Sequence, residues 1–385
     1  MLSIHRGYAC RNSGACCTAG WPIPAERATV EAVTTAIARR AFSIRGGAGA
    51  AGSSEGEAIQ QERLFIPRAA AEVDALPLLA TATDGRCVFF ERDHGRLCAI
   101  HRQLGHDALP SACRQFPRVT LTDARGSFVS LSHYCPAASR MLCRTDTRLQ
   151  IERRPQASDG IACEGLDARD TLPPLLRPGM LHSLDSYAAW ERFQVDVLAD
   201  ERRSVESAMA TIGLCAELVR GWTPALGTLE GHLARAVARA VAQHTADAPG
   251  APVRNALSLA QEVWASYPPP LVGPGPVDDF EGSWTRLAAP DWPTLARPVR
   301  HYLAARAFGS WIAYQGAGIR TAVHASRTAL ALLQIECVRR CQAGKRALDG
   351  EILLEAVRAA DLALVHLAAP DLLTRRLARF EAVPV

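Results

Sequence analysis

The sequence predicts a mainly α-helical protein, in which a small irregular α+β module rich in cysteine packs on an all-α helical region. The first observation is that apolar residues recur at three- and four-residue spacing from about residue 175 onward, as in 183–201 and 299–342. The second is that short β-like runs alternate with turns and cysteines before that point. Strands and helices do not alternate, which argues against a doubly wound sheet. We therefore expect a cysteine module over residues 1–165 and a helical region over 166–385.

Length and composition are those of a globular protein. The 385 residues have the length of two or three domains, and 48% of them are hydrophobic and 21% charged. This balance excludes general disorder. The formal net charge of +4 is too small for this length to predict a nucleic-acid partner.

The distribution of apolar residues bears on the compartment. No apolar stretch is long enough for a signal peptide at the start of the sequence or for a membrane span. We therefore expect a cytoplasmic protein without a membrane partner. Cytoplasmic thiols are kept reduced, so clustered cysteines are interpreted as metal-binding or catalytic before they are interpreted as disulfides.

The segment before the main cysteine stretch is predicted to be helical and then irregular. Residues 25–43 place Val30, Val33 and Ile37 at helical spacing. The glycine-rich stretch 45–57 that follows contains the pattern G-x-G-x-x-G. A dinucleotide-binding loop requires a buried strand before that pattern, and a basic helical segment stands there instead. We interpret the stretch as a surface insertion.

The chemistry is expected at the cysteines. Their spacings are C-x5-C-C near the N-terminus, C-x10-C in the middle, and two further cysteines downstream. Thiolates are soft ligands that suit iron–sulfur clusters and zinc. No C-x2-C pair typical of zinc sites is present. The candidate ligands, more than the four that one site ordinarily needs, are Cys10, Cys16, Cys17, Cys87, Cys98, Cys113 and Cys135.

The remaining cysteines have a simpler interpretation. Cys215, Cys337 and Cys341 stand in helical segments and are expected to be buried as small apolar residues. Cys337 and Cys341 lie one helical turn apart, so a shared ligand face stays open. Cys143 and Cys163 are equally compatible with a core thiol and an accessory ligand.

Histidines and arginines accompany the cysteine stretch. His94, His101, His106 and His133 could ligate a metal or act as a base, although a structural or surface role is the simpler interpretation for most of them. Arg114 and Arg118 flank Cys113, where a guanidinium would favour thiolates; simple pairing with surface acids explains them equally well.

These motifs resemble the flagellin lysine N-methylase family, within a wider set of proteins that share a cysteine-rich domain described as chelating zinc or iron. The resemblance rests on YACRNSGACCTAGWPIP, on GRLCAIHRQLGHDALPSACRQFPRV and on SFVSLSHYCPAAS. The later RHYLAARAFGSW is similar to a helical segment of the same family. In one departure, residues 11–15 lack the cysteine that such proteins usually carry there.

The resemblance implies transfer of a methyl group from S-adenosylmethionine to a protein lysine, with flagellin as the expected acceptor. It implies an iron–sulfur cluster of the [4Fe–4S] type, with the seven cysteines above as ligand candidates. His101 or His133 would be candidate bases. Two alternatives stay open: a non-catalytic protein that stores or delivers zinc or iron, and a structural zinc module whose helical region binds a partner.

Overall fold

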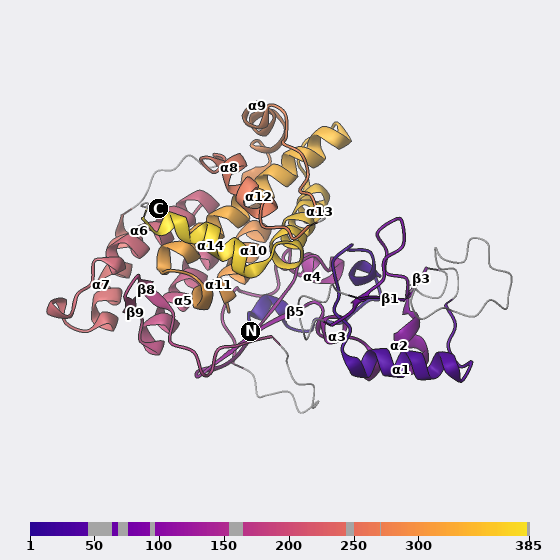
Figure 1. Ribbon diagram of the computed structural model, residues 1–385. Coiled ribbons are helices and arrows are strands. Elements are labelled where there is room, and N and C mark those ends of the chain that lie inside the picture. The colour runs from indigo at the N-terminus through magenta and orange to yellow at the C-terminus, as the bar shows by residue number, and fades with distance from the viewer. Residues whose placement is uncertain are drawn as a thin grey trace. The chain divides into compact units, whose positions relative to one another are not determined.

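The structure is a computed structural model that describes residues 1–44, 64–67, 76–92, 97–153, 165–243, 250–269 and 271–382. It is mainly α-helical with a small α+β part, which confirms the predicted fold class (Figure 1). The glycine-rich stretch 45–57, His94 and Cys163 lie outside the described residues.

The chain forms two compact units. Unit 1 comprises residues 1–8, 118–134 and 138–385, and unit 2 comprises residues 9–117 and 135–137. This division differs from the expected one at residue 165, because the first eight residues and the segment 118–134 pack with the helices that follow.

Unit 1 contains most of the helices. Serine, threonine and aspartate side chains cap several of their N-termini, as Ser183 does by accepting a bond from the amide of Ser186 at 3.0 Å. The α-helices are α5 (Leu184–Ala199), α6 (Val205–Arg220), α7 (Leu229–Ala242), α8 (Ala256–Trp264), α9 (Phe280–Ser283), α10 (Ala296–Ala307), α11 (Trp311–Gln315), α12 (Ile319–Gly344), α13 (Gly350–Asp361) and α14 (Pro370–Ala378). Shorter helical turns are η1 (Ser3–His5), η5 (Pro224–Leu226), η6 (Trp284–Ala288), η7 (Trp292–Leu295), η8 (Leu362–Leu367) and η9 (Arg379–Ala382).

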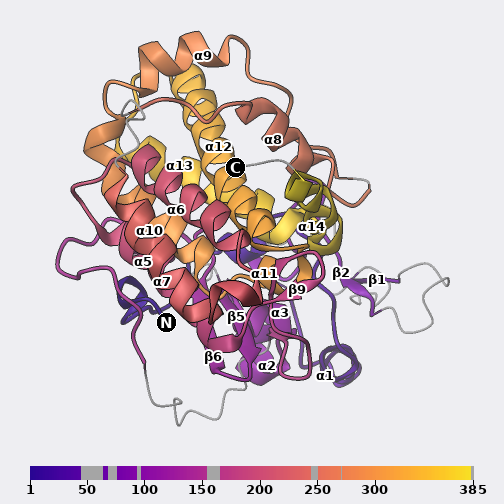
Figure 2. The same ribbon diagram turned by 90° about the vertical axis from the view of Figure 1, so that its left-hand side faces the viewer.

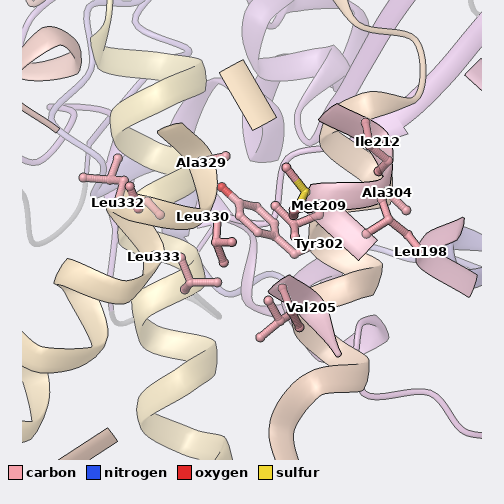
Figure 3. Packing of buried hydrophobic residues seen from close by; sticks show 14 of the residues in the cluster. Leu198, Val205, Met209, Ile212, Tyr302, Ala304, Ala329, Leu330, Leu332 and Leu333 are labelled. Carbon is pink, nitrogen blue, oxygen red and sulfur yellow. The ribbon is translucent and has the colours of Figure 1, made fainter. Parts of the chain in front are cut away.

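Helix α12 is the centre of unit 1. It packs against α6, α8, α10 and α13 (Figure 2). Because partners surround it, residues 328–338 are buried on every face of the helix. Close by, Tyr302 of α10 packs with Met209 of α6 and Leu330 of α12 (Figure 3). Burial of apolar side chains at this density provides the main stabilisation of the unit.

A β-hairpin belongs to unit 1. Strands β5 (Arg118–Asp123) and β6 (Gly126–Leu131) pair antiparallel, and β7 (Leu166–Asp167) pairs parallel with β5. The Ser130 hydroxyl donates to the Ala305 carbonyl at 3.1 Å, and the Trp311 indole donates to the Thr120 carbonyl at 2.9 Å. These long-range bonds explain why the hairpin joins the helices although cysteine segments flank it in sequence. A second, shorter pair consists of β8 (Leu175–Arg177) and β9 (Met180–Leu181).

Unit 2 consists of short elements. Its helical segments are η2 (Ala15–Cys17), α1 (Arg27–Ala38), α2 (Ala99–Leu104), η4 (His106–Ala108) and α3 (Ser111–Gln115), and α4 (Pro136–Met141) begins in it. Its strands are β1 (Phe65–Ile66), β2 (Leu78–Leu79), β3 (Phe90–Glu91) and β4 (Leu97–Cys98). The expected helix at 25–43 is therefore shorter, and the expected β-like runs around Cys87 and Cys98 form only two-residue strands.

The core of unit 2 is aromatic and aliphatic. The fully buried Phe89 ring lies 6.2 Å from the Phe42 ring and 5.9 Å from the Phe65 ring, measured between centroids. Ile100, Val33 and Cys87 belong to the same cluster. Elements this short have little stability of their own, so the side-chain cluster has to hold them together.

One absence concerns membranes. Among the described residues, no helix combines the length and the apolar character needed to cross a bilayer.

Candidate metal centre

Two cysteine segments are joined through the backbone. Cys16 and Cys17 end the turn η2. The Trp21 indole donates to the Cys16 carbonyl at 3.0 Å and so ties the following segment to this turn. The Cys87 amide donates to the Cys17 carbonyl at 2.8 Å. Residues far apart in sequence are thus held as direct neighbours.

Cys98 and Cys113 are positioned by local elements. Cys98 ends β4, is paired with Phe90 and directly precedes α2. Cys113 lies in α3, where the Glu26 carboxylate accepts hydrogen bonds from the Ser111 amide at 3.1 and 3.2 Å. A carboxylate at a helix N-terminus satisfies an amide that the helix itself leaves without a partner.

These segments bring five thiols into electrostatic contact. The Sγ atoms of Cys16 and Cys17 are 3.8 Å apart. The charges of Cys87 and Cys98 act on Cys17, and those of Cys16, Cys87 and Cys98 act on Cys113. Four of the five thiols also belong to the apolar cluster of unit 2. We call this group, made of Cys16, Cys17, Cys87, Cys98 and Cys113, the five-thiol cluster.

The thiol pKa values reflect this crowding. Burial, and then the charge of Cys98, raises the pKa of Cys87 to about 12, and burial raises the pKa of Cys98 to about 11. Burial and the charges of the neighbouring thiols raise the pKa of Cys113 well above its usual value. The hydrogen bond between adjacent thiols lowers the pKa of Cys16 and raises that of Cys17. Without a cation, the cluster therefore opposes carrying several thiolates.

The donor set fits a thiophilic metal. A bound cation would lower the pKa of each coordinating thiol, because coordination favours the thiolate. Sulfur ligands alone suit either iron–sulfur clusters or zinc. Within the described part of the chain, no three cysteine, histidine or acidic side chains form a group able to hold a metal ion as they stand. Binding would therefore require the side chains to draw together.

The other two predicted ligands, Cys10 and Cys135, also lie in unit 2 and are not members of the five-thiol cluster as defined above. Cys10 is exposed, and its Sγ accepts a bond from the Asn12 amide at 3.4 Å. Cys135 is buried just before α4. Cys215, Cys337 and Cys341 are buried in the helical core, as expected, and Cys143 is exposed in unit 1.

The polar residues proposed around the cysteines are placed differently. His101 and His106 are neighbours in unit 2, with ring centroids 5.8 Å apart. His133 belongs to unit 1, where its Nε2 lies 3.1 Å from Nε2 of His5. The main charges acting on Cys113 are negative, come from other thiols and Glu26, and raise its pKa. Arg114 instead donates to backbone carbonyls of residues 107 and 109.

Two polar groups were not expected from the sequence. In unit 2, Arg102 makes two hydrogen bonds, at 2.6 and 2.8 Å, to the fully buried Glu91. In unit 1, the Ser132 hydroxyl lies 2.7 Å from a carboxylate oxygen of Asp361 and 2.7 Å from Nε2 of His366. Serine is the middle member of this group and is 1% exposed, so the arrangement fits a structural bond better than an activated nucleophile. Nothing in the local sequence marks either group.

Comparison of the chain with family models, curated proteins and solved structures yields no match.

Proposed function

We propose that unit 2 holds an iron–sulfur centre through its thiols, and that the protein is a lysine N-methyltransferase that uses S-adenosylmethionine. The expected acceptor is a protein such as flagellin. The proposal also puts the protein in the cytoplasm, where these thiols stay reduced.

The supporting observation is the five-thiol cluster. Thiols from three separate parts of the sequence meet in one apolar cluster, although their mutual charges disfavour ionisation there. Buried cysteines that serve only as apolar residues do not need to gather. A metal ion or iron–sulfur cluster would attract each thiolate and so offset the repulsion between them.

The methyl-transfer part of the proposal rests on the sequence motifs. The segments around Cys16, Cys98, Cys113 and Cys135 resemble those of the lysine N-methylase family. Lysine titrates near pH ~10.4, so its amine must lose a proton before it can accept a methyl group. A bound iron centre would supply positive charge that favours the neutral amine.

The first experiment tests the metal. Protein purified without air should contain iron and acid-labile sulfide in similar amounts, and absorb near ~400 nm as iron–sulfur centres do. Stoichiometric zinc without sulfide would contradict the iron–sulfur proposal and favour the structural or storage role.

The second experiment tests the activity. Iron-loaded protein, labelled S-adenosylmethionine and flagellin from the same organism should give mass increases of one or more methyl groups on flagellin lysines. Cys98→Ser should abolish the transfer, whereas Cys143→Ser, at an exposed thiol of unit 1, should preserve it. No transfer by the fully loaded protein, with no binding of S-adenosylmethionine, would refute the methyltransferase proposal.

A further inference from the structure

A large cavity lies entirely within unit 1. It has a volume of about 990 Å³, near the upper end of the range for small-molecule sites. Helices α5, α7 and α10 line it, together with residues 145–149 and 200–203. This cavity plays no part in the function proposed above.

The cavity contains a buried arginine with unused donors. Arg300 is 6% exposed, and its Nη1 donates to the Arg203 carbonyl at 2.9 Å. Among the described residues, no carboxylate lies within ion-pair distance of Arg300 and no second acceptor bonds it. A guanidinium has five N–H donors, so most of those on Arg300 remain available to a ligand. The charges of Glu201 and Asp200 act on Arg300 from beyond ion-pair distance, yet burial still lowers its pKa. An anion in direct contact with the guanidinium would offset this cost of burial.

The other charges of the lining leave room for an anion. Arginine residues outnumber acidic residues there. Asp200 already pairs with Arg202 at 2.8 Å, and Glu201 with Arg297 at 3.0 Å. Arg148 and Arg192 have no carboxylate within ion-pair distance among the described residues. Their charges act on Asp196, whose pKa is nevertheless raised by burial. The fourth acid of the lining, Glu230, accepts a hydrogen bond from the Ser183 hydroxyl.

The floor of the cavity is apolar. Phe193, Leu198 and Leu233 line it and are at most 6% exposed. An aromatic ring can pack on such a surface while an attached anionic group reaches Arg300.

We propose that this cavity binds an organic phosphate of nucleotide size, with the phosphate on Arg300 and the ring system against Phe193 and Leu233. Arg148 and Arg192 add positive charge at the exposed part of the site.

Calorimetric titration of the full-length protein with adenosine 5′-monophosphate tests the proposal. Adenosine lacks the anion and inorganic phosphate lacks the ring, so both should bind at least about tenfold more weakly, because a hydrogen bond to a charged group contributes about 1.5–3 kcal/mol. Equal binding of adenosine and the nucleotide would overturn the role of the anion. Tighter binding of S-adenosylmethionine than of the nucleotide would overturn the assigned ligand class.

Three variants locate the binding. Arg300→Gln should weaken nucleotide binding by about tenfold or more. Ala234→Glu, at an exposed residue of the lining, should weaken it as well by adding a negative charge, and tests the cavity without altering its core. Arg339→Gln removes the same charge from α12 outside the cavity and should have no effect. The proposal would be overturned if the unmodified protein did not bind the nucleotide, or if Arg300→Gln and Ala234→Glu bound it as tightly as the unmodified protein does.

Discussion

The amide of Cys87 donates a hydrogen bond to the carbonyl of Cys17 at 2.8 Å, and this bond connects two cysteine segments that are 70 residues apart. It is made by the backbone, so it does not depend on the protonation of either thiol. The five-thiol cluster is therefore held partly by main-chain structure, which a ligand substitution would leave in place.

The cluster predicts a specific effect of Cys113→Ser. The variant should lose metal and melt at a lower temperature, because a hydroxyl is a weaker ligand for thiophilic metals. Metal analysis and thermal unfolding of the purified variant measure both effects. Cys143→Ser is the control and should alter neither. Full metal content with an unchanged melting temperature would remove Cys113 from the centre.

The buried ion pair of unit 2 predicts a large loss of stability in Arg102→Ala. Glu91 is fully buried, so its carboxylate would lose two charged hydrogen bonds without gaining water. Such losses cost about 3–5 kcal/mol for a fully buried pair, and less here because Arg102 is partly exposed. Urea unfolding measures the change.

Arg86→Ala is the matched control in the same unit. Arg86 pairs with Asp84 at the surface, and no measurable change is expected there. Equal stability of the two variants would show that the Glu91–Arg102 pair contributes little.

The buried histidines predict that stability falls in mild acid. Burial lowers the pKa of His133 to about 3, whereas histidine in the unfolded chain titrates near pH ~6.5. Between these values the unfolded state binds the extra proton. Lowering the pH below about 6.5 should therefore reduce the free energy of unfolding by about 1.4 kcal/mol per pH unit for this group.

Urea unfolding at pH 7.5, 6.5 and 5.5, followed by tryptophan fluorescence, measures that slope. His133→Gln should make it shallower. An identical slope in His133→Gln and the unmodified protein would contradict the assignment.

Asp361 predicts another effect in unit 1. One of its oxygens accepts from the Ser132 hydroxyl and the His133 amide, both at 2.7 Å, and from the Tyr134 amide at 3.3 Å. Asp361→Ala would remove this acceptor and should lower the free energy of unfolding by about 2–4 kcal/mol. Thermal or urea unfolding tests it, with Glu355→Ala on the exposed side of α13 as the control. A change below about 0.5 kcal/mol would show that water replaces the carboxylate.

Sequence patterns predicted part of this structure. Helical spacing identified the long helices of unit 1, because each buries one face or more and so repeats its apolar residues. Clustered cysteines identified the segments of the five-thiol cluster. The hairpin at 118–131 was assigned to the cysteine module because it lies between cysteines in the sequence. The hydrogen bonds of Ser130 and Trp311 instead place it in unit 1. Their partners are 175 and 191 positions away in the sequence, respectively.

Other features of the structure could not be predicted from the local sequence. Cys10 and Cys16 look alike in sequence, but only Cys16 belongs to the five-thiol cluster. Arg300 stands in a helical segment whose pattern does not distinguish a buried guanidinium from a surface one. The placement of the two cysteines and the burial of Arg300 both depend on tertiary packing, which the spacing of apolar residues does not predict.

The division of the chain has a consequence for biosynthesis. The side chains of Leu2 and Ile4 are fully buried in the core of unit 1, and Leu2 bridges to Ile151. Leu2 and Ile4 are synthesised before residues 9–117, whereas most of their partners in the core of unit 1 follow that segment. Residues 9–117, which carry all members of the five-thiol cluster, are complete in the meantime. If the proposed centre binds iron, the nascent chain can therefore capture it before the helical core closes, and a shortage of iron would affect unit 2 before unit 1 is complete.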